Sequence, residues 1–185
     1  PKYVQLAVNE GRAEEDVVRA RMIEHDEQVG ALLKKLDDLG VTNNTIVIYT
    51  TDNGNELLLW PDGGYAPFRG EKGTTWEGGV RVPCLVKWPG RIPAGRVSNG
   101  IQSHEDLFVT LAAAAGLANL EEELLRGHKA ANGTTYKVHL DGYNNLDHWT
   151  GKSAKSARRE FYYYDETDLM AIRVDNWKMH IGVKR

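Results

Sequence analysis

The chain has 185 residues, of which 41% are hydrophobic and 26% charged, which is the balance of a globular protein of one domain or little more. Its 23 basic and 26 acidic side chains leave a formal net charge of -3, which argues against a nucleic-acid partner, since such domains are usually strongly basic. No apolar run reaches the roughly 20 residues of a membrane span, so we expect none. Cys84 is the single cysteine, which excludes an internal disulfide and a cysteine-rich zinc site.

The first half of the chain has the pattern of an α/β layer. Apolar side chains at helical spacing predict a helix over residues 13–39, and Gly40 after its last turn is a typical C-cap. The apolar and β-branched run at 45–50 then predicts a strand that is buried on both faces in a parallel sheet. Helix, short loop and buried strand together indicate an α/β arrangement.

A glycine-rich stretch without periodicity follows at 52–79, and such long irregular segments are often functional loops. Residues 80–88 predict a second strand. Ser103 and Asp106 form a capping box before a helix that Gly116 closes. We interpret His104, Glu105 and Asp106 as a charged first helical turn rather than as ligands.

Beyond residue 118 the pattern changes to that of an antiparallel subdomain. A short acidic helix at 120–125 precedes strand-like runs at 136–140, 161–164, 170–174 and 177–181. Asp175 and Asn176 between the last two runs predict a hairpin turn, because both tolerate positive φ. We interpret the aromatic run 161–164 as core and sheet. We therefore expect two domains, 1–118 (the end of an α/β domain) and 119–185 (a smaller antiparallel α+β subdomain).

Asp52 and Asn53 directly follow the first predicted strand. Ligands of open α/β sheets bind beyond the carboxyl ends of strands, and carboxylate and amide oxygens are hard ligands for calcium or magnesium. The same Asp-Asn-Gly sequence is also an ordinary turn, and the spacing alone does not decide between the two interpretations.

Lys72 lies among four glycines in residues 68–79. Glycine permits close approach of the backbone to an anion, and lysine supplies a mobile point charge. The alternative is a solvated loop with no ligand.

Several segments together resemble the sulfatase family, particularly bacterial arylsulfatases. They are TIVIYTTDNG at 45–54, PFRGEKGTTWEGGVRVPCLVKWPGRIPAG at 67–95 and SHEDLFVTLAAAAGL at 103–117, with weaker matches at 22–40, 138–144 and 169–180. The resemblance implies an alkaline-phosphatase-like α/β/α fold with a smaller C-terminal domain on an antiparallel sheet. It also implies that Asp52 and Asn53 hold a divalent cation, usually calcium, and that Lys72 contacts the sulfate of the substrate.

The departures from the family are equally informative. Sulfatases make a formylglycine nucleophile from Cys or Ser in a Cys/Ser-x-Pro-x-Arg motif, and neither Cys84 nor any serine here fits it. We therefore expect the C-terminal portion of a sulfatase, inactive alone, whose partner is the missing N-terminal half. The chain begins without methionine or a recognisable signal peptide, which fits a processed or excised piece. By family analogy its location is periplasmic or secreted.

Two other functions remain open at this point. The chain could be a non-catalytic binding or assembly module of the same fold, or part of a phosphate or phosphonate ester hydrolase of the same superfamily. An upstream Cys-x-Pro-x-Arg segment in the gene would favour a sulfatase over a non-catalytic module. Comparing the turnover of sulfate and phosphate esters would separate a sulfatase from a phosphate or phosphonate ester hydrolase.

Overall fold

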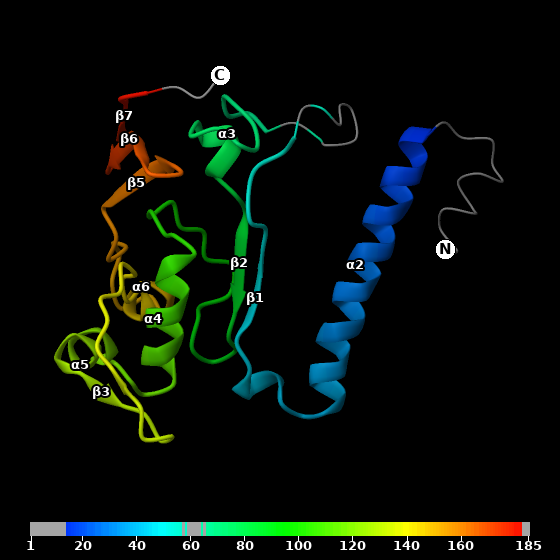
Figure 1. The fold of residues 1–185 in the computed structure, drawn as a ribbon. Coiled ribbons are helices and arrows are strands. Elements are labelled where there is room, and N and C mark those ends of the chain that lie inside the picture. The colour runs from blue at the N-terminus through cyan, green and yellow to red at the C-terminus, as the bar shows by residue number, and fades with distance from the viewer. Residues whose placement is uncertain (1–13, 57, 59–63, 65, 183–185) are drawn as a thin grey trace. The chain divides into compact units, whose positions relative to one another are not determined.

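A computed structural model describes residues 14–56, 58, 64 and 66–182, and these form two compact units (Figure 1). The first unit holds the described residues up to Gly90, and the second holds Arg91–Gly182. The expected boundary after residue 118 concerns domains of the family fold, and it stays a prediction. No helix among the described residues is both long and apolar enough to cross a bilayer.

The first unit begins with the predicted helix. Helix α2 spans Glu14–Asp38, within a residue of the expected bounds. Gly40 has a φ of 69°, and its N–H donates to the Asp37 carbonyl at 2.9 Å while the Val41 N–H donates to the Leu36 carbonyl at 3.1 Å. This pair of bonds is a Schellman motif, so the predicted C-cap is confirmed. A 3-10 turn, η1 (Thr42–Asn44), then leads into the first strand.

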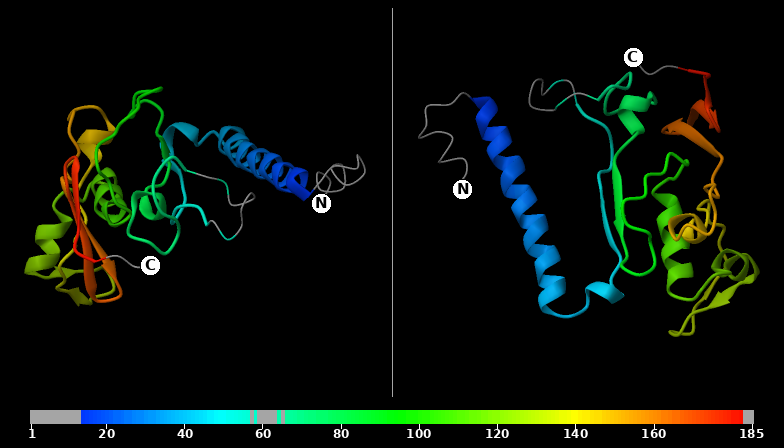
Figure 2. Two further views of the ribbon diagram at one scale, coloured as in Figure 1. Left: turned by 90° about the horizontal axis from the view of Figure 1, so that it is seen from above. Right: turned by 180° about the vertical axis from the view of Figure 1, so that it is seen from behind.

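Strand β1 (Val47–Thr50) is present as predicted. The prediction that it is buried on both faces in a parallel sheet is wrong for the described residues. It pairs antiparallel with β2 (Cys84–Lys87), and the two strands lie side by side in every view (Figure 2). Tyr49 is 40% exposed and Leu85 is 65% exposed, so neither strand is buried on both faces. An apolar, β-branched composition reports strand propensity, and it carries no information on the direction of the neighbouring strand.

Strand β2 is shorter than the predicted run 80–88. Glu77–Val80 forms a short helix, α3, and Pro83 just before the strand has no N–H for a ladder bond. The long connection from β1 to β2 therefore contains the glycine-rich loop and α3, which together carry the candidate site.

The second unit combines short helices with small antiparallel sheets. Its helices are α4 (Glu105–Ala114), α5 (Leu120–Arg126) and α6 (Leu146–Trp149). Strands β3 (His128–Lys129) and β4 (Thr135–Tyr136) pair with each other, so most of the expected run 136–140 is not strand. Strands β5 (Glu160–Asp165), β6 (Asp168–Val174) and β7 (Trp177–His180) form a three-stranded sheet.

Two turns in this unit confirm predictions. Val174 pairs with Trp177 across the Asp175–Asn176 turn, and Asp175 has a φ of 49°. Gly116, with a φ of 99°, closes α4 through a second Schellman pair of backbone bonds. The buried apolar side chains of the unit come from α4, α5, α6 and the sheet, and they are Val109, Ala113, Leu120, Leu124, Trp149, Tyr163 and Ala171.

Candidate functional site

Two loops of the first unit are tied together by their backbones. The Gly54 N–H donates to the Gly79 carbonyl at 2.9 Å, and the Lys72 N–H donates to the Asn55 carbonyl at 2.8 Å. The loop after β1 and the glycine-rich loop therefore form one structure, which fixes the backbone of Lys72 against the segment that begins with Asp52 and Asn53.

Glycine is required where these loops cross. A Cβ on Gly78 would lie 2.6 Å from the Phe68 carbonyl oxygen and 2.8 Å from that of Arg69, closer than side-chain carbons approach backbone oxygen. The Gly78 N–H instead donates to the Arg69 carbonyl at 2.7 Å. The Arg69 guanidinium lies 3.8 Å from the Trp76 ring centroid, a cation–π contact that fixes the far side of the loop.

The two predicted metal ligands are oxygen donors at the surface of this structure. Asp52 is exposed, and the Thr51 hydroxyl donates to its Oδ1 at 3.3 Å, whereas Asn53 is half-buried and its amide nitrogen donates to the Gly54 carbonyl at 2.7 Å. Nearby, the amide oxygen of Asn55 is buried and accepts no hydrogen bond from any described residue. This donor set fits a hard cation such as calcium.

The set is also incomplete. Among the described residues no group of three or more His, Cys, Asp or Glu side chains could hold a metal ion. Calcium takes about 6–8 oxygen ligands, and the side chains of Asp52, Asn53 and Asn55 could supply only part of such a shell.

Lys72 presents a solvated positive charge. Its ammonium lies 3.6 Å from Glu56 Oε2, and the two side chains are 53% and 37% exposed. An ion pair that is open to solvent contributes little free energy, so an anion can replace Glu56 at small cost. The structure therefore brings Lys72 to the Asp52–Asn53 segment through the backbone and leaves its charge available.

Cys84 lacks the lowered pKa of an activated nucleophile. It is exposed at the start of β2, opposite Thr50. Partial burial of the thiol raises the pKa of Cys84, and a hydrogen bond with Thr50 offsets this only in part. A raised pKa lowers the thiolate fraction at neutral pH, which is the opposite of activation.

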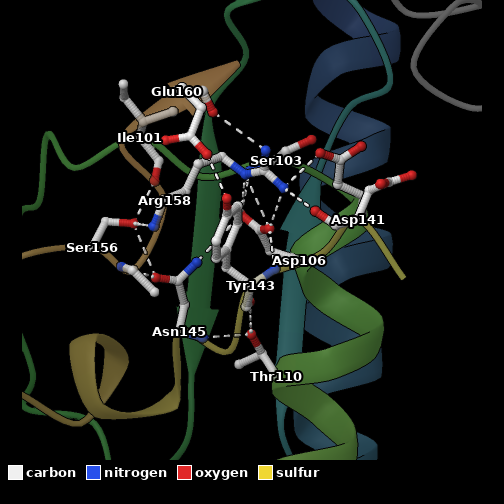
Figure 3. Close-up of polar contacts among 12 residues, drawn as sticks. Ile101, Ser103, Asp106, Thr110, Asp141, Tyr143, Asn145, Ser156, Arg158 and Glu160 are labelled. Atoms are coloured by element: carbon white, nitrogen blue, oxygen red, sulfur yellow. Dashed lines mark hydrogen bonds and ion pairs between the residues drawn. The ribbon is translucent and has the colours of Figure 1, made fainter. Parts of the chain in front are cut away.

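The second unit holds a buried ion pair that the sequence analysis did not anticipate (Figure 3). Asp106 is 1% exposed and Arg158 is 5% exposed. The Arg158 Nε donates to the carboxylate oxygens of Asp106 at 3.0 and 3.1 Å, and Nη2 donates to Oδ1 at 2.8 Å. The backbone N–H groups of Ser103 and Tyr143 donate to the same carboxylate at 2.9 and 2.7 Å. The interpretation of Asp106 as only a charged helical turn was therefore incomplete.

Arg158 has further acceptors around it. Its Nη2 lies 2.5 Å from Glu105 Oε1 and donates to the Asp141 carbonyl at 2.8 Å. Burial opposes the charge, but the hydrogen bonds and charges of Asp106 and Glu105 outweigh it, so the pKa of Arg158 lies above its ordinary value. Both ionic groups are fully engaged, which marks the pair as structural.

Comparison with known proteins identifies the family of this chain. The sulfatase family model matches residues 14–117, which include the Asp52–Asn53 segment, Lys72 and α4. The chain belongs to the sulfatase family. The chain is 38% identical over 159 residues to N-acetylgalactosamine-6-sulfatase of Canis lupus familiaris, a match that covers 85% of the chain and 27% of the relative. It is also 38% identical over 165 residues to arylsulfatase A of Homo sapiens, covering 86% and 29%.

Solved sulfatase structures share the fold. The PsFucS1 sulfatase from Pseudoalteromonas sp. has a TM-score of 0.75 at 30% identity, over 98% of this sulfatase chain and 39% of that one. Ps i-CgsB, solved in complex with k-i-k-neocarrahexaose, has a TM-score of 0.70 at 27% identity, over 96% and 36%. The expected fold class, the C-terminal part of an alkaline-phosphatase-like sulfatase fold with a small antiparallel sheet, is confirmed. The chain spans less than a third of these curated relatives' length.

Proposed function

We propose that the full-length protein hydrolyses sulfate monoesters with the help of a divalent cation, and that this chain supplies two cation ligands and one sulfate contact. The observation that carries the proposal is the backbone bond from Lys72 to Asn55, which ties the lysine to the segment holding Asp52 and Asn53. The printed names of the relatives include N-acetylgalactosamine-6-sulfatase, arylsulfatase and steryl-sulfatase, which have the sulfate ester in common. The proposal therefore commits to the ester and not to one alcohol or phenol.

Each residue has a distinct role in this proposal. The Lys72 ammonium neutralises charge that develops on the sulfate oxygens in the transition state. Asp52 and Asn53 would hold calcium, which when bound supplies Lewis-acid polarisation of the sulfate. The formylglycine nucleophile belongs to the N-terminal half, the partner this chain requires. A periplasmic or secreted location is part of the same proposal.

The decisive experiment is Lys72→Met in the full-length protein, assayed by aryl sulfate turnover beside a thermal melt. Methionine keeps a stem of similar length and removes the charge. A charge-assisted hydrogen bond contributes about 1.5–3 kcal/mol, so kcat/KM should fall roughly 10- to 150-fold with little change in Tm. Near-normal turnover by Lys72→Met would contradict the assignment.

Glu71→Gln is the matched control in the same loop. We expect its turnover to stay close to that of the unchanged protein. An equal loss in Glu71→Gln would show that the loop as a whole matters, rather than the charge of Lys72. Turnover of an aryl phosphate that exceeds that of the sulfate would favour the phosphate or phosphonate ester hydrolase instead.

The isolated chain provides a second test. It should show no aryl sulfate hydrolysis even with added calcium, because it has no nucleophile motif, and calorimetry should detect weak or no calcium binding. In the full-length protein calcium should bind, and Asp52→Ala should abolish that binding. Saturable hydrolysis by the isolated chain would refute its assignment as an inactive part, and tight calcium binding that survives Asp52→Ala would place the cation elsewhere. A gene with no Cys/Ser-x-Pro-x-Arg segment would favour a non-catalytic module.

A further inference from the structure

The second unit contains a cavity of about 530 Å³ that includes none of the proposed sulfate-site residues. Its wall comes from the start of α4, from α5, from residues 139–143 and from β5. Figure 3 shows part of this wall, with Asp141, Tyr143, Arg158 and Glu160 close together. The volume lies within the range of about 300–1,000 Å³ that is usual for small-molecule sites.

Aromatic rings form one side of the cavity. Tyr162 and Tyr164 both line it and are 50% and 59% exposed, whereas Tyr163 between them is 7% exposed. Successive side chains of a strand point to opposite faces, so β5 uses Tyr163 for the core and the other two tyrosines for the cavity. The interpretation of the aromatic run 161–164 as sheet is confirmed, because the whole run lies in β5, whereas among its tyrosines only Tyr163 belongs to the core. Each exposed ring offers an apolar face and a polar hydroxyl.

The polar lining is acidic. Four carboxylates and one guanidinium line the cavity. The guanidinium belongs to Arg158, and the carboxylates belong to Glu105, Glu121, Asp141 and Glu160. The carboxylates therefore outnumber the guanidinium by three. Arg158 is moreover engaged by Asp106 outside the lining. The cavity therefore repels a sulfated or phosphorylated group, and its carboxylates are strong acceptors for hydroxyl donors.

Burial is the main cause that raises the pKa of both Glu105 and Glu121. A partly desolvated carboxyl has lost hydrogen bonds to water, and a ligand with several hydroxyl groups replaces them. A wholly apolar ligand would cover the tyrosine rings and leave the Glu121 carboxyl without a partner, and Glu105 with Arg158 alone. The lining thus favours a ligand that has both an apolar face and an edge with hydroxyl groups.

We propose that this cavity binds a neutral, unsulfated sugar unit, with Tyr162 and Tyr164 against the C–H face of the ring and the carboxylates accepting its hydroxyl groups. The inference goes beyond sulfate hydrolysis, because it assigns a carbohydrate contact that uses none of the proposed sulfate-site residues and whose charge selects against sulfate. It needs neither a cation nor a nucleophile, so binding alone tests it.

The experiment titrates the 185-residue chain with N-acetylgalactosamine, with its 6-sulfate and with putrescine, an organic dication, and measures binding by isothermal titration calorimetry. We expect saturable binding of the neutral sugar and at least about tenfold weaker binding of the sulfated one. Tyr162→Ala and Tyr164→Ala should each weaken sugar binding about 2- to 12-fold, the loss of one ring contact. Tyr162→Phe should bind nearly as well as the unchanged chain, since it keeps the ring.

Tyr136→Ala is the matched control, because Tyr136 is 45% exposed and lies outside the cavity lining. It should leave sugar binding unchanged, and thermal melts should show that all variants fold. Glu121→Gln should reduce the difference in affinity between the neutral and the sulfated sugar, because it removes one negative charge from the lining. Failure of the neutral sugar to bind, binding of putrescine alone, or equal binding of the sulfated sugar would each overturn the proposal, whatever the sulfatase assays show.

Discussion

The loop structure around Lys72 and the ion pair of Asp106 with Arg158 both hold charged side chains, and they do so in opposite ways. Around Lys72 the backbone carries the structure, through bonds from Gly54 to Gly79 and from Lys72 to Asn55, and the lysine side chain remains 53% exposed. Around Arg158 the side chains carry the structure, and both charges are almost completely buried. The first arrangement leaves its charge open to solvent, where the proposed sulfate contact needs it, whereas the second uses its charges to fix the fold.

This difference predicts how the two regions respond to substitution. Removing a charge that the fold uses should lower stability, and removing a charge that is reserved for a ligand should lower activity at constant stability. Lys72→Met, assayed by turnover beside a thermal melt, tests the activity side of this contrast, and the predictions below test the stability side.

The largest effect is expected from Asp106→Ala. The change leaves Arg158 buried without its main partner and deprives the N–H groups of Ser103 and Tyr143 of their acceptor. Breaking a buried pair from one side costs about 3–5 kcal/mol, which corresponds to a fall in Tm of about 6–20 °C by calorimetry.

Glu105→Gln is the control for this change, because it alters a second partner of the same arginine on the same helix. The Glu105 side chain is 40% exposed, so its pair with Arg158 contributes at most about 1 kcal/mol. Equal losses of Tm from the two substitutions would show that burial does not distinguish the two carboxylates.

A smaller effect is expected from Gly78→Ala. The new methyl group would collide with the carbonyl oxygens of Phe68 and Arg69, so the loop must shift, at a cost of about 1–3 kcal/mol. Gly30→Ala in α2 is the matched control. Nothing lies near its Cβ position, and alanine should raise stability by about 0.5–1 kcal/mol. Urea unfolding measures the free energy of unfolding of both variants. An unchanged stability of Gly78→Ala would show that the loops can move apart at Gly78 without cost.

The smallest effect concerns the exposed pair of Arg159 with Asp175, which makes hydrogen bonds of 3.1 and 2.5 Å. The hydrogen bond from Arg159 lowers the pKa of Asp175 below its ordinary value of 3.8. A lowered pKa adds stability above 3.8 that is lost as the pH falls below it. Asp175→Asn keeps a residue that tolerates the φ of 49°, so its Tm should lie slightly below that of the unchanged chain at pH 7 and equal it in strong acid. A Tm difference that persists in strong acid would assign the effect to the turn.

Features that depend on neighbouring residues were predicted well from the sequence. Helix α2 and its cap at Gly40 follow from helical spacing and one glycine, and the hairpin at Asp175–Asn176 follows from turn chemistry. These signals act within a few residues, so the sequence displays them directly.

Features that depend on distant residues were not predicted from the sequence. The antiparallel partner of β1 lies beyond a long loop, and Arg158 is 52 residues from Asp106. Asp52, Asn53 and Lys72 were singled out as two separate weak patterns, and only the family resemblance joined them. The structure supplies the physical link, a glycine crossing that no periodicity reveals.

The single thiol of the chain has a practical consequence for spectroscopy. Cys84 is exposed and pairs across the sheet with Thr50, two residues before Asp52. A maleimide-linked fluorophore or nitroxide would therefore attach at one known position beside the candidate cation segment. Its raised pKa means that labelling proceeds faster in mildly alkaline buffer than at neutral pH. The chain is thus equipped, without any substitution, to report the arrival of an N-terminal half, and of calcium once that half is present, as a change in the signal of one probe.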